Sequence, residues 1–417
     1  AAKKGQLHQM LDQEAAAATV CDWSHTALDE AAAYALIDRA FVEFANDRPR
    51  PKHMQVPIAV LGGEAATPPP PPAAAPQRAA PDMAPIARML NTAQRPVFVF
   101  GGGALHASKA ARGVLAACGA ASFSTYAARG LVPSDTPGHF GAYLARPSSA
   151  EVFRQADLVV AVGTELSECD LWRPHLGHDC AMVRIDIDVS NLAEPGAIGI
   201  HADAKTALEA LERGLVPDKA QAWAQEEVAA AKARWRAESD AERPGLVAIA
   251  DALHAALPDR TMIYSDMTQL AYVAKETYEL DAPGLWHHPF GFGTLGYALP
   301  AAIGGKIAQG DKPVIAIAGD YGFHYTMQEL GVAVELGLSL PIVLWDNSEL
   351  KEIADSMRRV QIAPNAVVAR NPDFVALARA FGAHGVRPAS LADMQQEVQM
   401  ALARPGPTLI HVTPAAL

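Results

Sequence analysis

The sequence has few cysteines and no long uncharged apolar run. Its four cysteines are Cys21, Cys118, Cys169 and Cys180. No two of them form a CxxC pair, which excludes a zinc knuckle and a disulfide framework and favours free thiols in a reducing compartment. No apolar stretch reaches the roughly 18 residues of a membrane helix, and no signal peptide is recognisable. We therefore expect a cytoplasmic protein without a membrane anchor.

The sequence also lacks an excess of basic residues and is poor in aromatic residues, at 6%. Its 417 residues include 34 lysines and arginines against 46 aspartates and glutamates, which gives a formal net charge of -12. Because proteins bind nucleic acid through clustered positive charge, we expect no nucleic-acid partner. Half of the residues are hydrophobic, so a chain of this length can form two or three domains, each with its own core.

One strand-helix-strand unit stands out near the C-terminal end. Residues 313–318 form a short apolar run rich in β-branched residues, which is typical of a buried parallel strand. Apolar residues then recur at helical spacing over 326–336, and a second apolar strand is expected at 341–345. Such a crossover joins parallel neighbours, so Asp320 and Asn347 both follow the carboxyl ends of strands, where open α/β sheets bind ligands.

These two polar residues permit two interpretations. A carboxylate and an amide oxygen at one sheet edge suit a hard cation such as Mg²⁺, which commonly also binds phosphate oxygens. Alternatively, Asp320 and Asn347 only turn the chain after each strand, because such turns favour Asp and Asn. The spacing alone does not decide between a metal-bridged diphosphate site and a pair of turns.

Strand, helix and proline signals divide the rest of the chain. We expect a helix and a strand in 1–61, a proline and alanine linker at 62–85, alternating strands and helices over 86–215, a connecting helix at 216–243 and a last domain over 244–417. This pattern predicts an α/β fold with tandem doubly wound parallel sheets. The first domain is expected to be incomplete, because one helix and one strand cannot bury enough surface.

A run of three glycines, Gly101 to Gly103, follows the first expected strand of the 86–215 region. Such a turn is compatible with dinucleotide binding, but the G-x-G-x-x-G pattern is missing, and no acidic residue follows a second strand at the required distance. The weight is against a nucleotide site here, and the alternative stays open.

Three stretches of the last region resemble thiamin-diphosphate-dependent 2-oxo acid decarboxylases and acetolactate synthases. They are Asp266–Gln269, Phe290–Gly304 and Ala316–Asn347, and they occur in the order of the family. The last is similar to the family's cofactor motif, which opens with Gly-Asp-Gly and closes with Asn after a strand. Tyr321 stands where the third residue of that opening is usually Gly. The resemblance implies the thiamin-diphosphate enzyme fold, with thiamin diphosphate and Mg²⁺ as cofactors.

The resemblance also implies roles for individual residues. Asp320 and Asn347 match the metal ligands, and the main-chain carbonyl of Glu349 completes the set. Gln269 matches a diphosphate contact, the carbonyl of Gly293 a partner of the cofactor's amino group, and Leu295 the apolar residue that props the cofactor in its bent shape. The remaining cofactor-binding residues expected from the motif are Gly319, Tyr321 and Gly322.

Residues 1–61 resemble the last third of the family's pyrimidine-binding domain. Arg48-Pro-Arg-Pro51 is similar to its Arg-Pro-Gly-Pro turn, with Arg50 in place of Gly. The family's catalytic glutamate belongs to the earlier part of that domain, so no residue of this sequence matches it. The resemblance implies a homodimer or homotetramer, and a separate chain that supplies the missing segment is the alternative.

Within the family, the pattern is closest to the branch that decarboxylates 5-guanidino-2-oxopentanoate. A guanidinium group would require a bidentate carboxylate, and Glu349, Glu352 and Asp355 are candidates by position. His287 and His288, just before the Gly-rich loop, are tentative candidates for proton transfer. The alternatives are an acetolactate synthase-like carboligase and a catalytically silent homologue with a structural or regulatory role.

Overall fold

The computed structural model describes residues 7, 10–68, 70 and 79–416. The chain divides into two compact units, one of residues 1–80 with 187–190 and one of residues 81–186 with 191–417. Most of the proline-rich centre of the expected linker lies outside the described residues. Among the helices that are described, none combines the length and the apolar character needed to cross a membrane.

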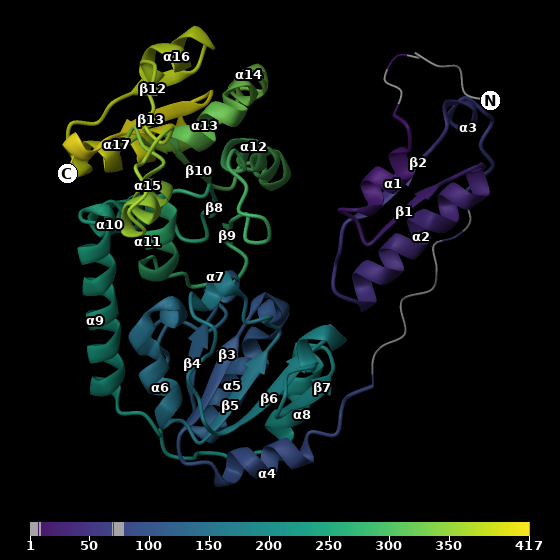
Figure 1. The fold of residues 1–417 in the computed structure, drawn as a ribbon, viewed down its shortest axis with the longest axis vertical. Helices are drawn as coiled ribbons and strands as arrows, with labels where there is room; N and C mark the ends of the chain where they lie inside the picture. Colours follow the sequence, from purple (N-terminus) through teal and green to yellow (C-terminus); the bar gives the residue numbers. More distant parts are fainter. Residues whose placement is uncertain (1–6, 8–9, 69, 71–78, 417) are drawn as a thin grey trace. The chain divides into compact units, whose positions relative to one another are not determined.

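The first unit contains a two-stranded parallel sheet and three helices (Figure 1). Strands β1 (Trp23–Thr26) and β2 (Lys52–Gln55) pair over four residues each, and the helices are α1 (Gln13–Ala18), α2 (Glu30–Asn46) and α3 (Ile58–Leu61). Helix α2 begins where Asp29 accepts a hydrogen bond from the Ala32 amide, as a capping aspartate does. No side chain of α2 is fully buried, so this helix contributes little core.

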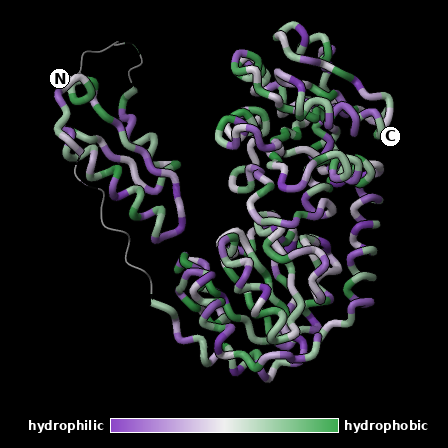
Figure 2. Tube along the Cα trace, turned by 180° about the vertical axis from the view of Figure 1, so that it is seen from behind, coloured by the Kyte–Doolittle hydropathy of each residue, from purple (hydrophilic) through white to green (hydrophobic). Residues whose placement is uncertain are grey.

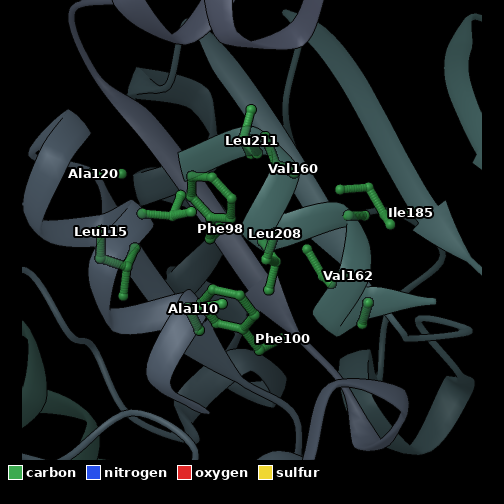
Figure 3. Close-up of a cluster of buried hydrophobic side chains, with 14 of the residues drawn as sticks. Phe98, Phe100, Ala110, Leu115, Ala120, Val160, Val162, Ile185, Leu208 and Leu211 are labelled. Carbon is green, nitrogen blue, oxygen red and sulfur yellow. The ribbon is translucent and has the colours of Figure 1, made fainter. Parts of the chain in front are cut away.

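The first half of the second unit is a five-stranded parallel sheet in the order β4-β3-β5-β6-β7. Its strands are β3 (Pro96–Phe100), β4 (Ala121–Ser124), β5 (Leu158–Val162), β6 (Ala181–Asp186) and β7 (Ala197–His201). Its helices are α4 (Ala84–Thr92), α5 (Ser108–Cys118), α6 (Ala150–Gln155), α7 (Glu168–Leu171) and α8 (Ala204–Gly214). The sheet residues alternate between two buried clusters, so helices cover both of its faces. Figure 3 shows one of these clusters, in which strands β3, β5 and β6 face α5 and α8 through Phe98, Phe100, Ala110, Leu115, Val160, Val162, Ile185, Leu208 and Leu211.

The Gly-Gly-Gly turn after β3 packs closely against the backbone at Gly163. A Cβ atom on Gly101 would lie 2.2 Å from the carbonyl oxygen of Gly163, and one on Gly103 would lie 2.9 Å from the Gly163 Cα. The amide of Gly103 also donates to the Gly163 carbonyl at 2.9 Å. Glycine is required here because two backbones approach each other, so the turn has a packing reason of its own.

The second half of the second unit is a six-stranded parallel sheet in the order β12-β13-β11-β10-β8-β9. Its strands are β8 (Met262–Ser265), β9 (Trp286–His287), β10 (Val314–Gly319), β11 (Pro341–Trp345), β12 (His384–Val386) and β13 (Thr408–Val412). Its helices include α10 (Leu246–Ala256), α11 (Gln269–Thr277), α12 (Ala298–Gln309), α15 (Lys351–Arg359), α16 (Phe374–Ala380) and α17 (Leu391–Ala403). Two buried clusters again lie on opposite faces of the sheet, which confirms the predicted α/β class with doubly wound parallel sheets.

The helix expected over 326–336 differs from the one observed. Helix α13 begins at Asp320, directly after β10, and continues to Thr326. A 3₁₀ turn at Met327–Glu329 then leads into α14 (Leu330–Glu335). Apolar periodicity did not reveal α13, because its buried residues, Asp320, Gly322 and Phe323, include only one large apolar side chain. Asp320 therefore lies at a helix start rather than in a loop.

Helix α9 (Gln225–Glu242) connects the two halves and carries both hydrophobic and hydrophilic residues along its length (Figure 2). Near its end the halves share a buried ion pair between Arg146 of the first half and Glu276 of α11, with a 3.0 Å hydrogen bond from Arg146 Nη2 to Glu276 Oε1. Tyr126 donates to the same carboxylate at 3.1 Å, and Ser239 of α9 donates to it at 2.7 Å. The carboxylate is thus satisfied from both halves, as a buried charge must be.

Two adjacent glycines of α12 provide a matched test of close packing in the second half of the second unit. A Cβ on Gly305 would lie 2.3 Å from the Tyr264 ring, which itself stacks on His287, whereas a Cβ on Gly304 would meet nothing within 4 Å. We expect Gly305→Ala to lower the free energy of unfolding by about 1–3 kcal/mol, and Gly304→Ala to raise it by about 0.5–1 kcal/mol, because glycine weakens a helix interior. Urea denaturation would measure both, and equal changes would contradict the packing described here.

Candidate functional site

Four neighbouring strands of the six-stranded sheet end at one edge, which we call the carboxyl edge. Because the strands are parallel, Ile317 pairs with Ser265, Gly319 with Trp345, and Trp345 with Val412. The polar residues brought to this edge are Asp266 after β8, Asp320 after β10, Asp346 and Asn347 after β11, and His411 in β13. The expected metal ligands Asp320 and Asn347 therefore follow adjacent strands.

A hydrogen-bonded network surrounds Asp320. Asn371 donates through Nδ2 to Asp320 Oδ2 at 2.8 Å and to Asp346 Oδ1 at 2.7 Å. The other carboxylate oxygen of Asp346 lies 2.8 Å from His411 Nε2. Burial raises the pKa of Asp320, and the neighbouring Asp346 carboxylate adds to the rise. For Asp346 burial alone would raise the pKa, but the hydrogen bonds from His411 and Asn371 outweigh it and hold the pKa at about 2.

The turn after β11 is tightly held. Asp346 Oδ1 accepts from the Ser348 amide at 2.9 Å, and Ser348 has a φ of 56°, an unusual value for a residue with a side chain. The Glu349 amide donates to the side-chain oxygen of Asn347 at 3.2 Å. The Glu349 carboxylate pairs with Arg358 at 2.6 Å. With the side chain engaged in this way, the main-chain carbonyl is the group of Glu349 to consider as a ligand.

Asn347 leads into a second polar chain. Its Nδ2 donates to Gln269 Oε1 at 3.4 Å, and Gln269, the first residue of α11, donates to Glu352 Oε1 at 2.8 Å. Arg243 donates to both carboxylate oxygens of Glu352, through Nε at 2.8 Å and Nη2 at 3.2 Å. Asp355, another carboxylate considered for a guanidinium group, is paired with Lys351 and Arg358. Each of the three carboxylates proposed for a substrate guanidinium is thus already paired with a cation of the chain.

Asp266 anchors the Gly-rich loop and was not identified from the sequence as a site residue. Its carboxylate accepts from the amides of Gly296 at 3.2 Å and Tyr297 at 2.9 Å. A Cβ on Gly322 would lie 2.0 Å from Asp266 Oδ2, so glycine is required there. Burial raises the pKa of Asp266 to about 6 although these amides oppose the rise. The carboxylate therefore connects β8, the loop before α12, and α13.

The other residues expected to bind the cofactor lie along the same edge. Gly319 ends β10, and a Cβ on it would lie 2.9 Å from Thr268 Oγ1. Gly293 has a φ of 65° and lies in an exposed loop beside Met267, with the half-buried Leu295 two residues later. Tyr321 lies in the first turn of α13 and is not among the residues with positive φ. The family's glycine is therefore not needed for backbone conformation at this position.

The two histidines considered for proton transfer have different surroundings. His288 is buried, with Nδ1 2.8 Å from Ser265 Oγ and Nε2 3.1 Å from Met267 Sδ. Burial, together with the nearby cations Lys275 and Arg129, lowers the pKa of His288 to about 2, which makes it a neutral and weak base. His287 is half-buried and stacks on Tyr264 with ring centroids 4.7 Å apart. A proton-transfer role for either residue stays a prediction.

The side chains at the carboxyl edge suit a hard cation. Asp320 and Asn347 offer a carboxylate and an amide oxygen at adjacent strand ends, which is the ligand chemistry of Mg²⁺. A zinc site built from side chains alone would need at least three His, Cys, Asp or Glu side chains close together. Over the described residues, no such group is found. The arrangement thus fits a cation that receives its remaining ligands from main chain, water or a diphosphate.

The raised pKa of Asp266 predicts a pH-dependent stability. Because the folded-state pKa of about 6 lies above the unfolded value near 3.9, the folded chain binds this proton more tightly. The stabilisation is present below about pH 4 and is lost as the pH rises through 6. We expect the free energy of unfolding of the natural chain, relative to Asp266→Asn, to fall by on the order of 3 kcal/mol between pH 4 and pH 7. Denaturant titrations across this range would test it, and parallel pH curves for the two proteins would contradict it.

Comparisons with known proteins agree on one family. The chain matches the central domain of thiamine pyrophosphate enzymes over residues 83–211 and their C-terminal TPP binding domain over residues 266–412. A probable 2-ketoarginine decarboxylase of Pseudomonas aeruginosa is 38% identical, over 98% of this chain and 74% of its own length. The acetolactate synthase isozyme 1 large subunit of Escherichia coli is 27% identical, over 89% of this chain and 68% of its own.

A solved structure agrees with the fold. Benzoylformate decarboxylase from Polynucleobacter necessarius superposes with a TM-score of 0.76 and 18% identity, covering 94% of this chain and 76% of the other. At that identity the likeness concerns the fold alone. Together with the two domain matches and the 38% identical relative, it leads to one conclusion. The chain belongs to the thiamine pyrophosphate enzyme family, in the group of 2-oxo acid decarboxylases and acetolactate synthases.

Proposed function

We propose that this chain performs the thiamin-diphosphate- and Mg²⁺-dependent, non-oxidative decarboxylation of a 2-oxo acid, with 5-guanidino-2-oxopentanoate (2-ketoarginine) as substrate. The observation that supports binding of the cofactor is that Asp320 and Asn347 follow the carboxyl ends of β10 and β11, which pair with each other. The substrate is inferred from the 38% identical relative, which is named for 2-ketoarginine. The cytoplasm and a homodimer or homotetramer are the setting we propose for it.

In this proposal the carboxyl edge holds the cofactor. Asp320, Asn347 and the carbonyl of Glu349 bind Mg²⁺, while Gln269 contacts the diphosphate. Gly319, Tyr321 and Gly322 bring the backbone of the β10–α13 junction close to it. Thiamin diphosphate, when bound, supplies the electron sink for the decarboxylation, and the protein supplies binding and orientation.

Asp266 would orient the other end of the cofactor. By accepting from the amides of Gly296 and Tyr297, it fixes the end of the loop that carries Gly293 and Leu295. These two residues are the proposed partners of the aminopyrimidine ring, through a main-chain carbonyl and an apolar contact. A rigid anchor of this kind keeps the carbonyl in a productive position, because small misplacements at a reacting centre are costly.

A carboligase of the acetolactate synthase type is the second candidate, favoured by the 27% identical relative that covers 89% of this chain.

The structure also limits how the preferred substrate would be recognised. The guanidinium of Arg243 already donates to both carboxylate oxygens of Glu352. If 5-guanidino-2-oxopentanoate is the substrate, its guanidinium group must either displace Arg243 or bind elsewhere.

Cofactor binding tests the proposed site. We expect thiamin diphosphate to bind the natural chain only with Mg²⁺, and Asp320→Ala to weaken this binding at least about a hundredfold, because it removes a direct ligand whereas outer partners alone are worth 10- to 100-fold. Titration calorimetry would measure both. Asp311→Ala, an exposed aspartate just before β10, is the matched control and should bind like the natural chain. Equal affinities for the natural chain and Asp320→Ala would contradict the assignment.

Substrate choice needs a separate assay. With saturating cofactor, CO₂ release from 5-guanidino-2-oxopentanoate should exceed release from pyruvate and from 2-oxoglutarate. Formation of acetolactate from pyruvate at a higher rate would favour the carboligase instead. Cofactor binding without turnover of any 2-oxo acid would reject the catalytic proposal for this chain while retaining the site.

A further inference from the structure

We propose that Asn371, His411 and Arg387 form a positioning chain behind the metal site, which fixes the orientation of the Asp320 carboxylate for the cation. This inference rests on the proposed Mg²⁺ site and assigns work to residues outside its ligand set. None of the three would touch the cation. They would act by determining where Asp320 points.

Asn371 bridges two neighbouring carboxylates, whose mutual repulsion it offsets by donating to both. Its side-chain nitrogen carries two hydrogens, and one serves Asp320 Oδ2 at 2.8 Å while the other serves Asp346 Oδ1 at 2.7 Å. Carboxylates accept only, so the nitrogen of the amide must face them. Its oxygen lies 3.1 Å from His324 Nε2, which completes the amide's hydrogen bonding. The side chain is thus bound on three sides and cannot rotate freely.

The tautomer of His411 follows from its neighbour. Arg387 approaches His411 Nδ1 through Nε at 3.2 Å and Nη2 at 3.0 Å. Because a guanidinium only donates, Nδ1 must accept, and the neutral ring therefore carries its hydrogen on Nε2. That hydrogen is donated to Asp346 Oδ2 at 2.8 Å. The donors run in one direction, from Arg387 through His411 to Asp346.

Asp346 is consequently held at both oxygens. His411 binds Oδ2, while Asn371 and the Ser348 amide bind Oδ1, at 2.7 and 2.9 Å. A carboxylate held in this way is fixed in place, and it fixes in turn the amide of Asn371. Besides the Tyr321 amide, Asp320 accepts from the same Asn371 amide, which therefore ties the orientation of Asp320 to that of Asp346.

Burial and the local backbone hold the hydrogen-bonded side chains between His411 and Asp320 rigidly. Asp320, Asp346 and His411 are 4%, 8% and 3% exposed, so their hydrogen bonds act in a medium of low dielectric constant. The ring of His411 packs against Phe374 with centroids 5.4 Å apart. Asn371 is followed by a proline and by Asp373, whose side chain caps α16 by accepting from two of its amides. These contacts fix the backbone from which the amide projects.

The test measures the Mg²⁺ concentration for half-maximal binding of thiamin diphosphate. Partners of a metal ligand typically contribute 10- to 100-fold to metal affinity. We therefore expect Asn371→Ala and His411→Phe each to raise this concentration about tenfold or more. His411→Phe keeps an aromatic ring against Phe374 and removes only the nitrogens. Asn365→Ala, an exposed asparagine of the same segment, should leave the concentration within about twofold of the natural value, well below the tenfold effect expected of a positioning partner.

The double variant Asn371→Ala/His411→Phe shows whether Asn371 and His411 act as one hydrogen-bonded series or as two independent residues. If the residues act as a unit, the double variant should be affected no more than the stronger single variant, whereas independent sites would multiply. Arg387 is exposed, and Arg387→Met removes no direct partner of a buried carboxylate. It should raise the Mg²⁺ requirement in the same direction by a smaller factor. It provides the test if the buried variants do not fold.

The outcomes separate this inference from the proposed function. Metal-dependent binding in the natural chain with an unchanged Mg²⁺ requirement in Asn371→Ala or Arg387→Met would overturn the positioning chain alone. A multiplicative effect in the double variant would also overturn it. No metal-dependent binding in the natural chain would overturn both proposals together.

Discussion

Parallel pairing of β8, β10, β11 and β13 is the constraint on which the candidate site depends. Since all four strands run in one direction, each delivers its following residue to the same edge, although these residues lie far apart in the sequence. Asp266, Asp320 and Asp346 meet there for this reason. Three acidic side chains at one edge are unstable unless donors compensate them. Backbone amides do so for Asp266, the Asn371 amide is shared by Asp320 and Asp346, and His411 and the Ser348 amide add to Asp346.

The same crowding accounts for the residues found at two neighbouring positions, Tyr321 and Gly322. At Gly322 a side chain would collide with the Asp266 carboxylate, so the position must lack a Cβ. At Tyr321, one residue earlier, the backbone is helical and the side chain projects without such a collision. Hence the departure from the family motif occurs at the position where this chain tolerates a side chain, and the glycine that is retained is the one that packing demands.

Local sequence patterns predicted the regular elements better than their surroundings. Strand β11 has the bounds expected from the sequence and β10 begins and ends one residue later than expected, because each is an apolar run with clear ends. Helix α13 was missed because its helical character comes from its place after β10 and not from apolar spacing.

The site residues likewise divide into those that the sequence could predict and those that it could not. Asp320 and Asn347 could be placed together from two strands and a crossover, which is a short-range inference. Asn371 and His411 could not, because they lie 51 and 65 residues from the carboxylates they bind, Asp320 and Asp346, and polar residues give no periodic signal. Asp266 could have been found by the same strand-end reasoning that identified Asp320. The pairing of Glu352 with Arg243, 109 residues apart, likewise became visible only in three dimensions.

The ion pair between Arg146 and Glu276 has a consequence for how the two halves of the second unit can change. Glu276 is buried, so replacing Arg146 alone removes the cation that compensates its charge, which costs far more than the pair itself contributes. Tyr126 and Ser239 depend on the same carboxylate, so their positions are restricted with it. Related sequences should therefore exchange this set together or not at all. A central domain transplanted from another member of the family would have to bring a guanidinium to the same place before it could dock.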